Sequence, residues 1–187
     1  MNDNVHDVGV LVGSLRSQSY SRKLALALRA TAPPGLRLRI IEIGAMSLYN
    51  ADHEPQPAWL EFRREIKASD ALLIVTPEYN RSIPSALKNA IDVGSRPKGG
   101  SAFDAKPAAV ISVSPGALGA FGANHHLRQS LMCLNVAVMP APEAYIGGID
   151  KLFAEDGSIA LESPRQFLDA FMRAFAQWIA RLSTPAT

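Results

Sequence analysis

The amino-acid sequence predicts one α/β domain in which helices cover both faces of a five-stranded parallel sheet. Short, continuous apolar segments alternate with longer segments in which apolar residues recur at helical spacing. Continuous apolar segments are typical of strands that are buried on both faces, as parallel strands are. Five such alternations favour a sheet joined by right-handed crossovers. The 187 residues show no repeat, low-complexity tract or linker, so we expect a single domain over residues 1–187.

The first elements follow from the order of apolar and helix-breaking residues. Val8–Gly13 is apolar up to its final glycine and is predicted as the first strand. A helix is expected over Ser19–Ala32, because two prolines follow it. Leu36–Ile43 is predicted as the second strand. Its apolar residues alternate at first with Arg37 and Arg39, which indicates that one end lies near the edge of the sheet.

The middle of the chain continues the alternation. A long connection, Gly44–Pro57, leads to a helix expected over Ala58–Ala68. Asp70–Thr76 follows with five consecutive apolar residues and is predicted as the third strand. The strand stops before a proline, so we expect a loop to begin at Pro77.

The next helix runs from Ser82 or Pro84 to Val93, and Gly94 is expected to stop it. A polar, glycine-rich loop then leads to the fourth strand, Pro107–Val113, which is again apolar throughout most of its length.

The last elements are two helices and a strand. A helix is expected over Ala123–Leu134 and the fifth strand over Val136–Met139. The final helix has a capping box at Ser163–Gln166, with proline at its first helical position. Large apolar residues then recur every three or four positions and are predicted to form its core face. These are Phe167, Phe171, Phe175, Trp178 and Leu182.

Composition excludes several classes of protein. A net charge of only +2 argues against a nucleic-acid-binding surface. No apolar segment approaches the length of a membrane span. Met1–Val8 shows no signal-peptide pattern, and a single cysteine allows no intramolecular disulfide, so we expect a cytoplasmic protein. That cysteine, Cys133, has apolar neighbours and is predicted to be buried.

The loop after the first strand is the strongest candidate for a binding site. It reads Gly13-Ser14-Leu15-Arg16-Ser17-Gln18-Ser19-Tyr20-Ser21 and runs into the start of a helix, where free N–H groups favour an anion. Four serines and one arginine add donors, which suits a phosphate monoester. The pattern matches neither the dinucleotide fingerprint nor the nucleoside triphosphate loop. The alternative is a serine-rich capping turn with a solvated arginine.

Two further loops lie at the same edge of the predicted sheet. Thr76–Pro84 offers an aromatic ring, an amide side chain and backbone donors, as a planar heteroaromatic ligand requires. Ser114–Gly122 carries three glycines that allow a close approach of the backbone to a flat ligand. An ordinary turn and a flexible edge loop are the alternatives. A metal site is not expected, because His125 and His126 are adjacent rather than three or four residues apart.

Together the three segments Gly13–Ser19, Thr76–Asn80 and Leu87–Asp92 resemble the NADPH-dependent FMN reductase family, and within it the bacterial quinone and chromate reductases. The resemblance extends from about Val8 to Leu182. It implies a flavodoxin-like three-layer sandwich with strand order 2-1-3-4-5 and a non-covalently bound FMN.

The resemblance also implies roles for individual residues. Those implied to hold the phosphate are Ser14, Arg16, Ser19, Tyr20 and Ser21. Those implied to line the edge of the isoalloxazine ring are Pro77, Glu78, Tyr79 and Asn80, with Ser114 and Gly116 near its other side. The flavin would carry the chemistry, so no side chain is named as catalytic.

The activity implied is ping-pong transfer of hydride from NADPH or NADH to FMN and then to an acceptor. A quinone, a free flavin, chromate or an azo compound could serve as this small-molecule acceptor. Family members pair through the helices expected over Ser85–Val93 and Ala123–Leu134, so a homodimer or homotetramer is expected. Two alternatives are a flavodoxin-type electron carrier, which does not oxidise NAD(P)H directly, and a pyridine-nucleotide Rossmann enzyme without flavin.

Overall fold

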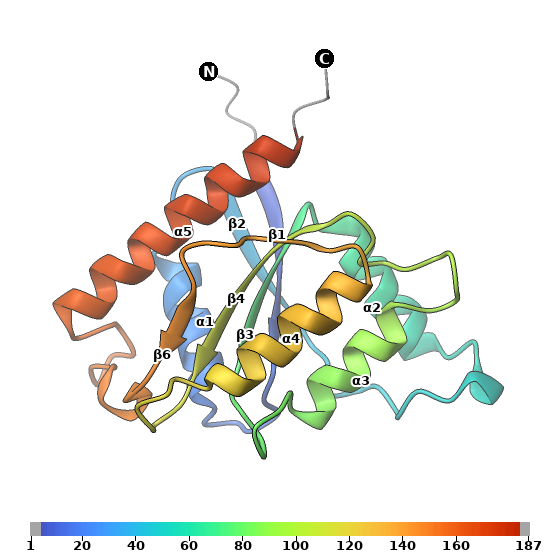
Figure 1. Cartoon of the computed structure of the whole chain (residues 1–187), viewed down its shortest axis with the longest axis horizontal. Helices are drawn as coiled ribbons and strands as arrows, with labels where there is room; N and C mark the ends of the chain where they lie inside the picture. Colours follow the sequence, from blue (N-terminus) through green and yellow to red (C-terminus); the bar gives the residue numbers. More distant parts are fainter. Residues whose placement is uncertain (1–4, 184–187) are drawn as a thin grey trace.

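A parallel sheet lies between two layers of helices in the computed structural model, which describes residues 5–183 (Figure 1). The elements are β1 (His6–Val12), α1 (Tyr20–Ala30), β2 (Leu36–Ile41), η1 (Ala51–His53), α2 (Pro57–Ala68), β3 (Ala71–Thr76), α3 (Ser85–Gly94), β4 (Pro107–Val113), α4 (Phe121–Cys133), β5 (Ala137–Val138), β6 (Ala144–Ile146), η2 (Ile149–Lys151) and α5 (Glu162–Ser183). Residues 1–4 and 184–187 lie outside the described residues. The first of these ranges is part of Met1–Val8, the segment in which no signal-peptide pattern was found.

The strand order confirms the flavodoxin-like arrangement. The order is β2-β1-β3-β4-β5, and all pairs are parallel. β2 lies at an edge, as the alternating arginines predicted. Arg37 forms an ion pair with Asp7, and Arg39 with Glu65, so the charged residues of this edge strand are neutralised locally.

The fifth strand is divided, which the sequence did not reveal. β5 pairs with Pro107 and Ala108 at the start of β4, whereas β6 pairs with the last three residues of β4. The segment between them contains Pro140 and Pro142. Proline has no N–H to donate to a ladder, so continuous pairing over this stretch is interrupted.

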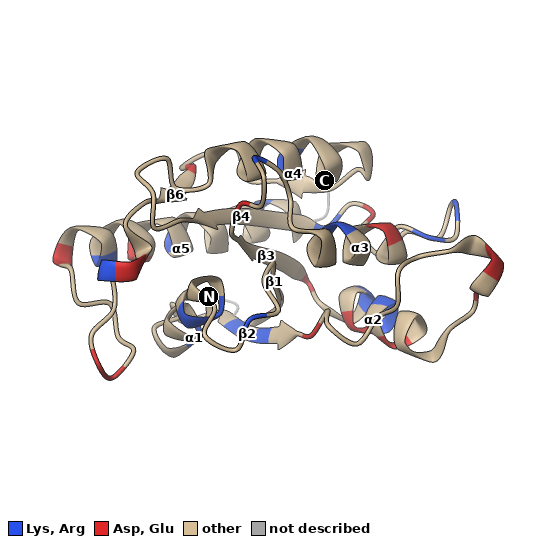
Figure 2. Cartoon of the chain, turned by 90° about the horizontal axis from the view of Figure 1, so that it is seen from below, with Lys and Arg blue, Asp and Glu red and all other residues tan. Residues whose placement is uncertain are grey.

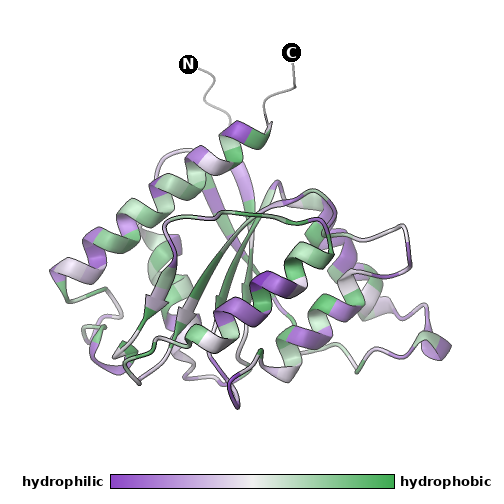
Figure 3. Cartoon of the chain, in the orientation of Figure 1, coloured by the Kyte–Doolittle hydropathy of each residue, from purple (hydrophilic) through white to green (hydrophobic). Residues whose placement is uncertain are grey.

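Two apolar cores lie on opposite faces of the sheet. α1 and α5 pack on one face, and α2, α3 and α4 pack on the other. Successive residues of β1 alternate between them: Val10 faces the first core and Leu11 the second. The inner strands are hydrophobic along their length (Figure 3). In the part of the chain that the structure describes, no helix is long and apolar enough to cross a membrane.

The predicted start and core face of the last helix need correction. α5 begins at Glu162, so Ser163 lies inside the helix and does not cap it. The Glu162 carboxylate instead accepts hydrogen bonds from Arg165 and Gln166. Of the predicted core residues, Phe171 and Phe175 are buried and Trp178 is partly buried, whereas Phe167 and Leu182 are exposed, because they lie outside the buried stripe of the helix. The buried stripe consists of Leu168, Phe171, Met172, Phe175 and Ile179.

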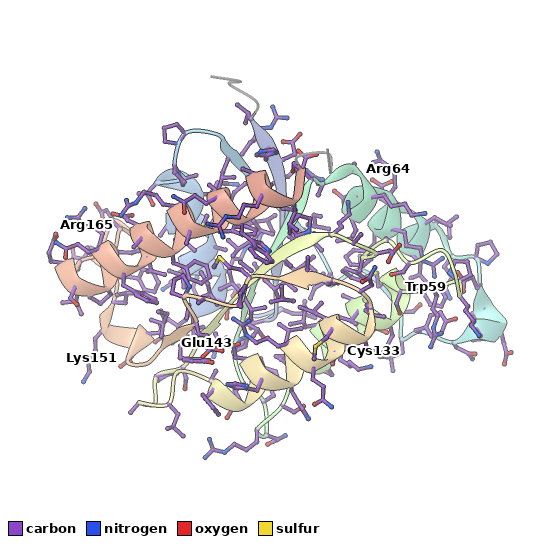
Figure 4. The ribbon with its side chains drawn as sticks, turned by 45° about the horizontal axis from the view of Figure 1, so that its top comes forward. Trp59, Arg64, Cys133, Glu143, Lys151 and Arg165 are labelled. Carbon is purple, nitrogen blue, oxygen red and sulfur yellow. The ribbon has the colours of Figure 1, made fainter. Side chains whose placement is uncertain are left out.

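Gly94 and Cys133 also differ from expectation. The helix α3 includes Gly94 as its last residue, one residue beyond the expected end at Val93, and a Cβ there would lie 2.4 Å from the Phe103 ring. Packing against Phe103 is therefore the reason for this glycine. Cys133 is exposed near the end of α4, because it lies outside the helix face that carries Leu127 and Leu131 (Figure 4).

The long connection between β2 and α2 is anchored to α3 by a buried amide. The Asn89 Oδ1 accepts a hydrogen bond from the Tyr49 N–H at 2.8 Å, and its Nδ2 donates to the Ser47 carbonyl at 2.9 Å. Asn89 belongs to the segment Leu87–Asp92 that carried part of the family resemblance. These two hydrogen bonds show that Asn89 supports the loop between β2 and α2.

Candidate functional site

The three candidate loops meet at one edge of the sheet, where β1, β3 and β4 end. They enclose a cavity of about 170 Å³, called the strand-end cavity below. Its lining residues are Ser14, Arg16, Ser19, Tyr20, Ser21, Pro77, Glu78, Tyr79, Val113, Ser114, Pro115 and Ile149. Figure 2 views the molecule from this edge and shows acidic and basic residues interspersed, without a large field of either sign.

The loop from β1 to α1 presents a helix N-terminus to the cavity. Gly13 lets β1 approach β3 closely, because a Cβ there would lie 2.5 Å from Thr76 Oγ1. The Ser19 hydroxyl caps α1 by accepting from the Arg22 N–H at 3.3 Å. The first turn of α1 contains no acidic residue. The positive end of its dipole is therefore left for an anion in the cavity.

Two donors in this loop have no partner among the residues that the structure describes. The Ser21 Oγ is buried and forms no hydrogen bond with any residue that the structure describes. Over the same residues, the Arg16 guanidinium has no hydrogen bond or ion pair. A buried hydroxyl without a partner is costly. The donor set therefore fits a phosphate, which accepts several hydrogen bonds at once.

The loop after β3 forms a tight turn at the rim of the cavity. Tyr79 and Ser82 exchange backbone hydrogen bonds of 3.1 and 3.0 Å. Asn80 and Arg81 between them have φ of 52° and 63°, which makes this a type I′ turn. The turn fixes the position of Tyr79, while Asn80 is exposed and does not line the cavity.

Glu78 connects this loop to α4. One carboxylate oxygen accepts a hydrogen bond of 3.0 Å from the Ala123 N–H, and the other accepts one of 3.2 Å from Arg81. The Glu78 side chain is 13% exposed, so its carboxylate is directed mainly toward the protein.

The loop after β4 forms the opposite wall. The Ser114 Oγ accepts a hydrogen bond of 3.0 Å from the Gly116 N–H, which closes the first turn of this loop. Gly119 is left-handed, with φ of 56°, and a Cβ there would lie 2.5 Å from the Tyr145 carbonyl carbon. Only glycine fits this contact with β6. Gly116 is exposed and does not line the strand-end cavity.

Three aromatic rings form a cluster beyond this wall. Phe121 lies 4.2 Å from the His125 ring and 5.2 Å from the Tyr145 ring, measured between ring centroids. His125 Nε2 and the Tyr145 hydroxyl are 3.0 Å apart. Burial, and then the nearby Glu143 carboxylate, raise the pKa of Tyr145 to about 12. The Tyr145 phenol is therefore protonated at neutral pH.

The structure thus brings all the predicted site residues except Asn80 and Gly116 onto one cavity. Sequence reasoning missed Val113, Pro115 and Ile149. The first two flank a residue that was predicted, so the end of β4 could have indicated them. Ile149 lies in a short helix after the divided strand, and its segment carries no motif. Among the residues described, no group of three or more His, Cys, Asp or Glu could hold a metal ion.

Comparison with known proteins adds to this geometry. The family model for NADPH-dependent FMN reductase matches residues 6–151. A quinone reductase of Pseudomonas putida is 57% identical over 178 residues, covering 94% of this chain and 95% of that protein. A 2-hydroxy-1,4-benzoquinone reductase of Burkholderia sp is 41% identical over 175 residues, covering 92% and 95%. The structure of FerB, a flavoenzyme NAD(P)H:(acceptor) oxidoreductase from Paracoccus denitrificans, matches with a TM-score of 0.90 at 41% identity, covering 95% of this chain and 98% of that one.

Proposed function

The chain belongs to the NADPH-dependent FMN reductase family, and from this premise we propose that it reduces a quinone with electrons from NAD(P)H through FMN held in the strand-end cavity. Bound FMN supplies the hydride-accepting and hydride-donating chemistry. The observation that carries the placement is the buried Ser21 Oγ in the first turn of α1, which has no hydrogen-bond partner among the described residues.

The residues of the chain have two tasks in this proposal. Ser14, Arg16, Ser19, Tyr20 and Ser21 hold the phosphate, and α1 contributes its dipole. Pro77, Glu78 and Tyr79 form the ring side of the site, opposite Ser114, and Asn80 and Gly116 lie outside the lining of the cavity. Holding both reactants in place is the protein's contribution to the rate, because positioning alone can remove several kcal/mol from a barrier.

A quinone is the proposed acceptor, because relatives covering nearly the whole chain carry the names quinone reductase and 2-hydroxy-1,4-benzoquinone reductase. Free flavin, chromate and azo compounds are further candidates for comparison under the same assay. The proposal places the enzyme in the cytoplasm as a homodimer or homotetramer. The contact between subunits would use α3 and α4. A cavity of about 590 Å³ between these two helices is lined in part by Ile91, Cys133 and Leu134.

The first test is spectroscopic. The purified protein should be yellow, or become yellow with added FMN, and anaerobic NADPH or NADH should bleach the flavin absorption. A protein that binds no FMN would contradict the proposal. A protein whose bound FMN is not bleached by either nucleotide would instead be an electron carrier.

Ping-pong kinetics are the second expected result. The nicotinamide and the quinone would use the same open face of the flavin ring, so the first product has to leave before the acceptor enters. Initial rates at several fixed quinone concentrations should give parallel double-reciprocal lines. Intersecting lines would show that donor and acceptor bind together and that a second site exists.

A further inference from the structure

We propose that the Glu78 carboxylate is a positioning group that joins the two walls of the flavin site by capping α4, rather than a group that binds the cofactor. The inference rests on the proposed function, because it assigns Glu78 a role in shaping the site for the flavin ring. It also revises the role that the family resemblance implied for Glu78.

The start of α4 lacks a cap of its own. Its N-cap residue is Ala120, which is left-handed, with φ of 61°, and has no side chain that could accept a hydrogen bond. The backbone bond from the Asn124 N–H to the Ala120 carbonyl opens the helix. The Ala123 N–H comes one residue earlier, among the N–H groups that have no acceptor within a helix. The Glu78 carboxylate accepts from it at 3.0 Å, and its charge opposes the positive end of the helix dipole.

The hydrogen bond from Ala123 to Glu78 holds the loop after β3 close to the first turn of α4. A Cβ on Gly122 would lie 2.9 Å from Glu78 Oε2 and 3.0 Å from the Arg81 carbonyl. The turn that follows Glu78 is therefore packed directly against the first turn of α4. Glycine at position 122 is what lets the carboxylate reach the helix end.

The two segments that Glu78 connects are the two walls of the strand-end cavity. Pro77, Glu78 and Tyr79 line one wall, and Ser114 and Pro115 line the other. The second wall runs directly into α4 through Ala120. A bond from Glu78 to α4 therefore sets the spacing between the walls, and this spacing decides how a flat ring fits between them.

Arg81 provides a matched control. It also bonds to Glu78, at 3.2 Å, but its side chain is 76% exposed and it does not line the cavity. An exposed ion pair contributes little, so loss of Arg81 should leave the cap in place. Glu78→Gln keeps an oxygen that can accept from the Ala123 N–H and should retain most of the contact.

The experiment measures two properties of the full-length protein and of the variants Glu78→Ala, Glu78→Gln and Arg81→Ala. The first is amide hydrogen exchange at Ala123, with and without FMN. The second is the affinity for FMN and for riboflavin, which has the same ring and no phosphate. Circular dichroism checks that each variant is folded.

Glu78→Ala should raise the exchange rate of the Ala123 amide about tenfold or more, because its hydrogen-bond acceptor is lost. The same variant should weaken the binding of FMN and of riboflavin by the same factor, on the order of tenfold, because the effect acts on the ring end of the site, which both ligands share. Glu78→Gln should recover most of both properties, and Arg81→Ala should resemble the wild type.

Three results would overturn the proposal. Unchanged exchange at Ala123 in Glu78→Ala would show that no cap exists. Faster exchange with unchanged flavin affinity would show a cap without a role in the site. Glu78→Gln with normal exchange but flavin affinity as weak as that of Glu78→Ala would show direct contact with the cofactor. Failure of the wild type to bind flavin would refute the proposed function instead, and exchange at Ala123 would still report on the cap.

Discussion

Arg16→Ala is expected to weaken FMN binding by roughly 10- to 150-fold while leaving riboflavin binding nearly unchanged. Arg16 lines the strand-end cavity, and among the residues described its guanidinium has no hydrogen-bond or ion-pair partner. A hydrogen bond between two charged groups is typically worth about 1.5–3 kcal/mol, which gives this range. Arg16→Lys should recover only part of the loss, because an ammonium cannot reproduce the planar fork of arginine.

Flavin fluorescence quenching with both ligands, at one ionic strength, measures the effect. Arg29→Ala is the matched control, since Arg29 is an exposed arginine in the last turn of α1, away from the cavity. Equal weakening of FMN and riboflavin by Arg16→Ala, in a folded protein, would show that Arg16 does not bind the phosphate.

Glu54→Gln is expected to lower the free energy of unfolding by about 2–4 kcal/mol. Arg63 is 8% exposed, forms an ion pair with Glu54 and donates from its Nε to the Val93 carbonyl at 2.8 Å. Removing one partner of a buried pair leaves an uncompensated charge in the interior, which is strongly destabilising. Glu54 is 21% exposed, so water offsets part of the loss and the expected value lies below that of a fully buried pair.

Urea denaturation with a constant m-value measures this change. The control is Glu61→Gln, which breaks the exposed ion pair with Arg64 on the same helix, α2, and should leave stability unchanged within error. Similar stabilities for the two variants would show that the Glu54–Arg63 pair contributes no more than a surface pair does.

Local sequence patterns predicted the parts of this structure that local interactions determine. The inner strands β3 and β4 are buried throughout and apolar except for Thr76 and Ser112, and their predicted ranges match the observed ones within one residue. The position of the loop between β1 and α1 was predictable for the same reason, since Ser19 caps the helix that follows it directly in the chain.

Features that depend on distant residues were not predictable. α4 begins two residues earlier than expected, because its cap is supplied by Glu78, which is 45 residues away in sequence. The role of Asn89 depends on a loop 40 residues earlier. Ile149 reaches the strand-end cavity only because the fifth strand is divided and its second part returns to β4. No local pattern reports such pairings.

The divided fifth strand has a consequence for association between folded chains through the edges of their sheets. An edge strand with unpaired N–H and C=O groups can template intermolecular pairing and aggregation. Here that edge is short, is interrupted by prolines, and has its Ala137 carbonyl occupied by the Trp178 indole N–H at 2.8 Å. The opposite edge, β2, carries arginines. The apolar inner strands are thus shielded at both sides from adding a foreign strand.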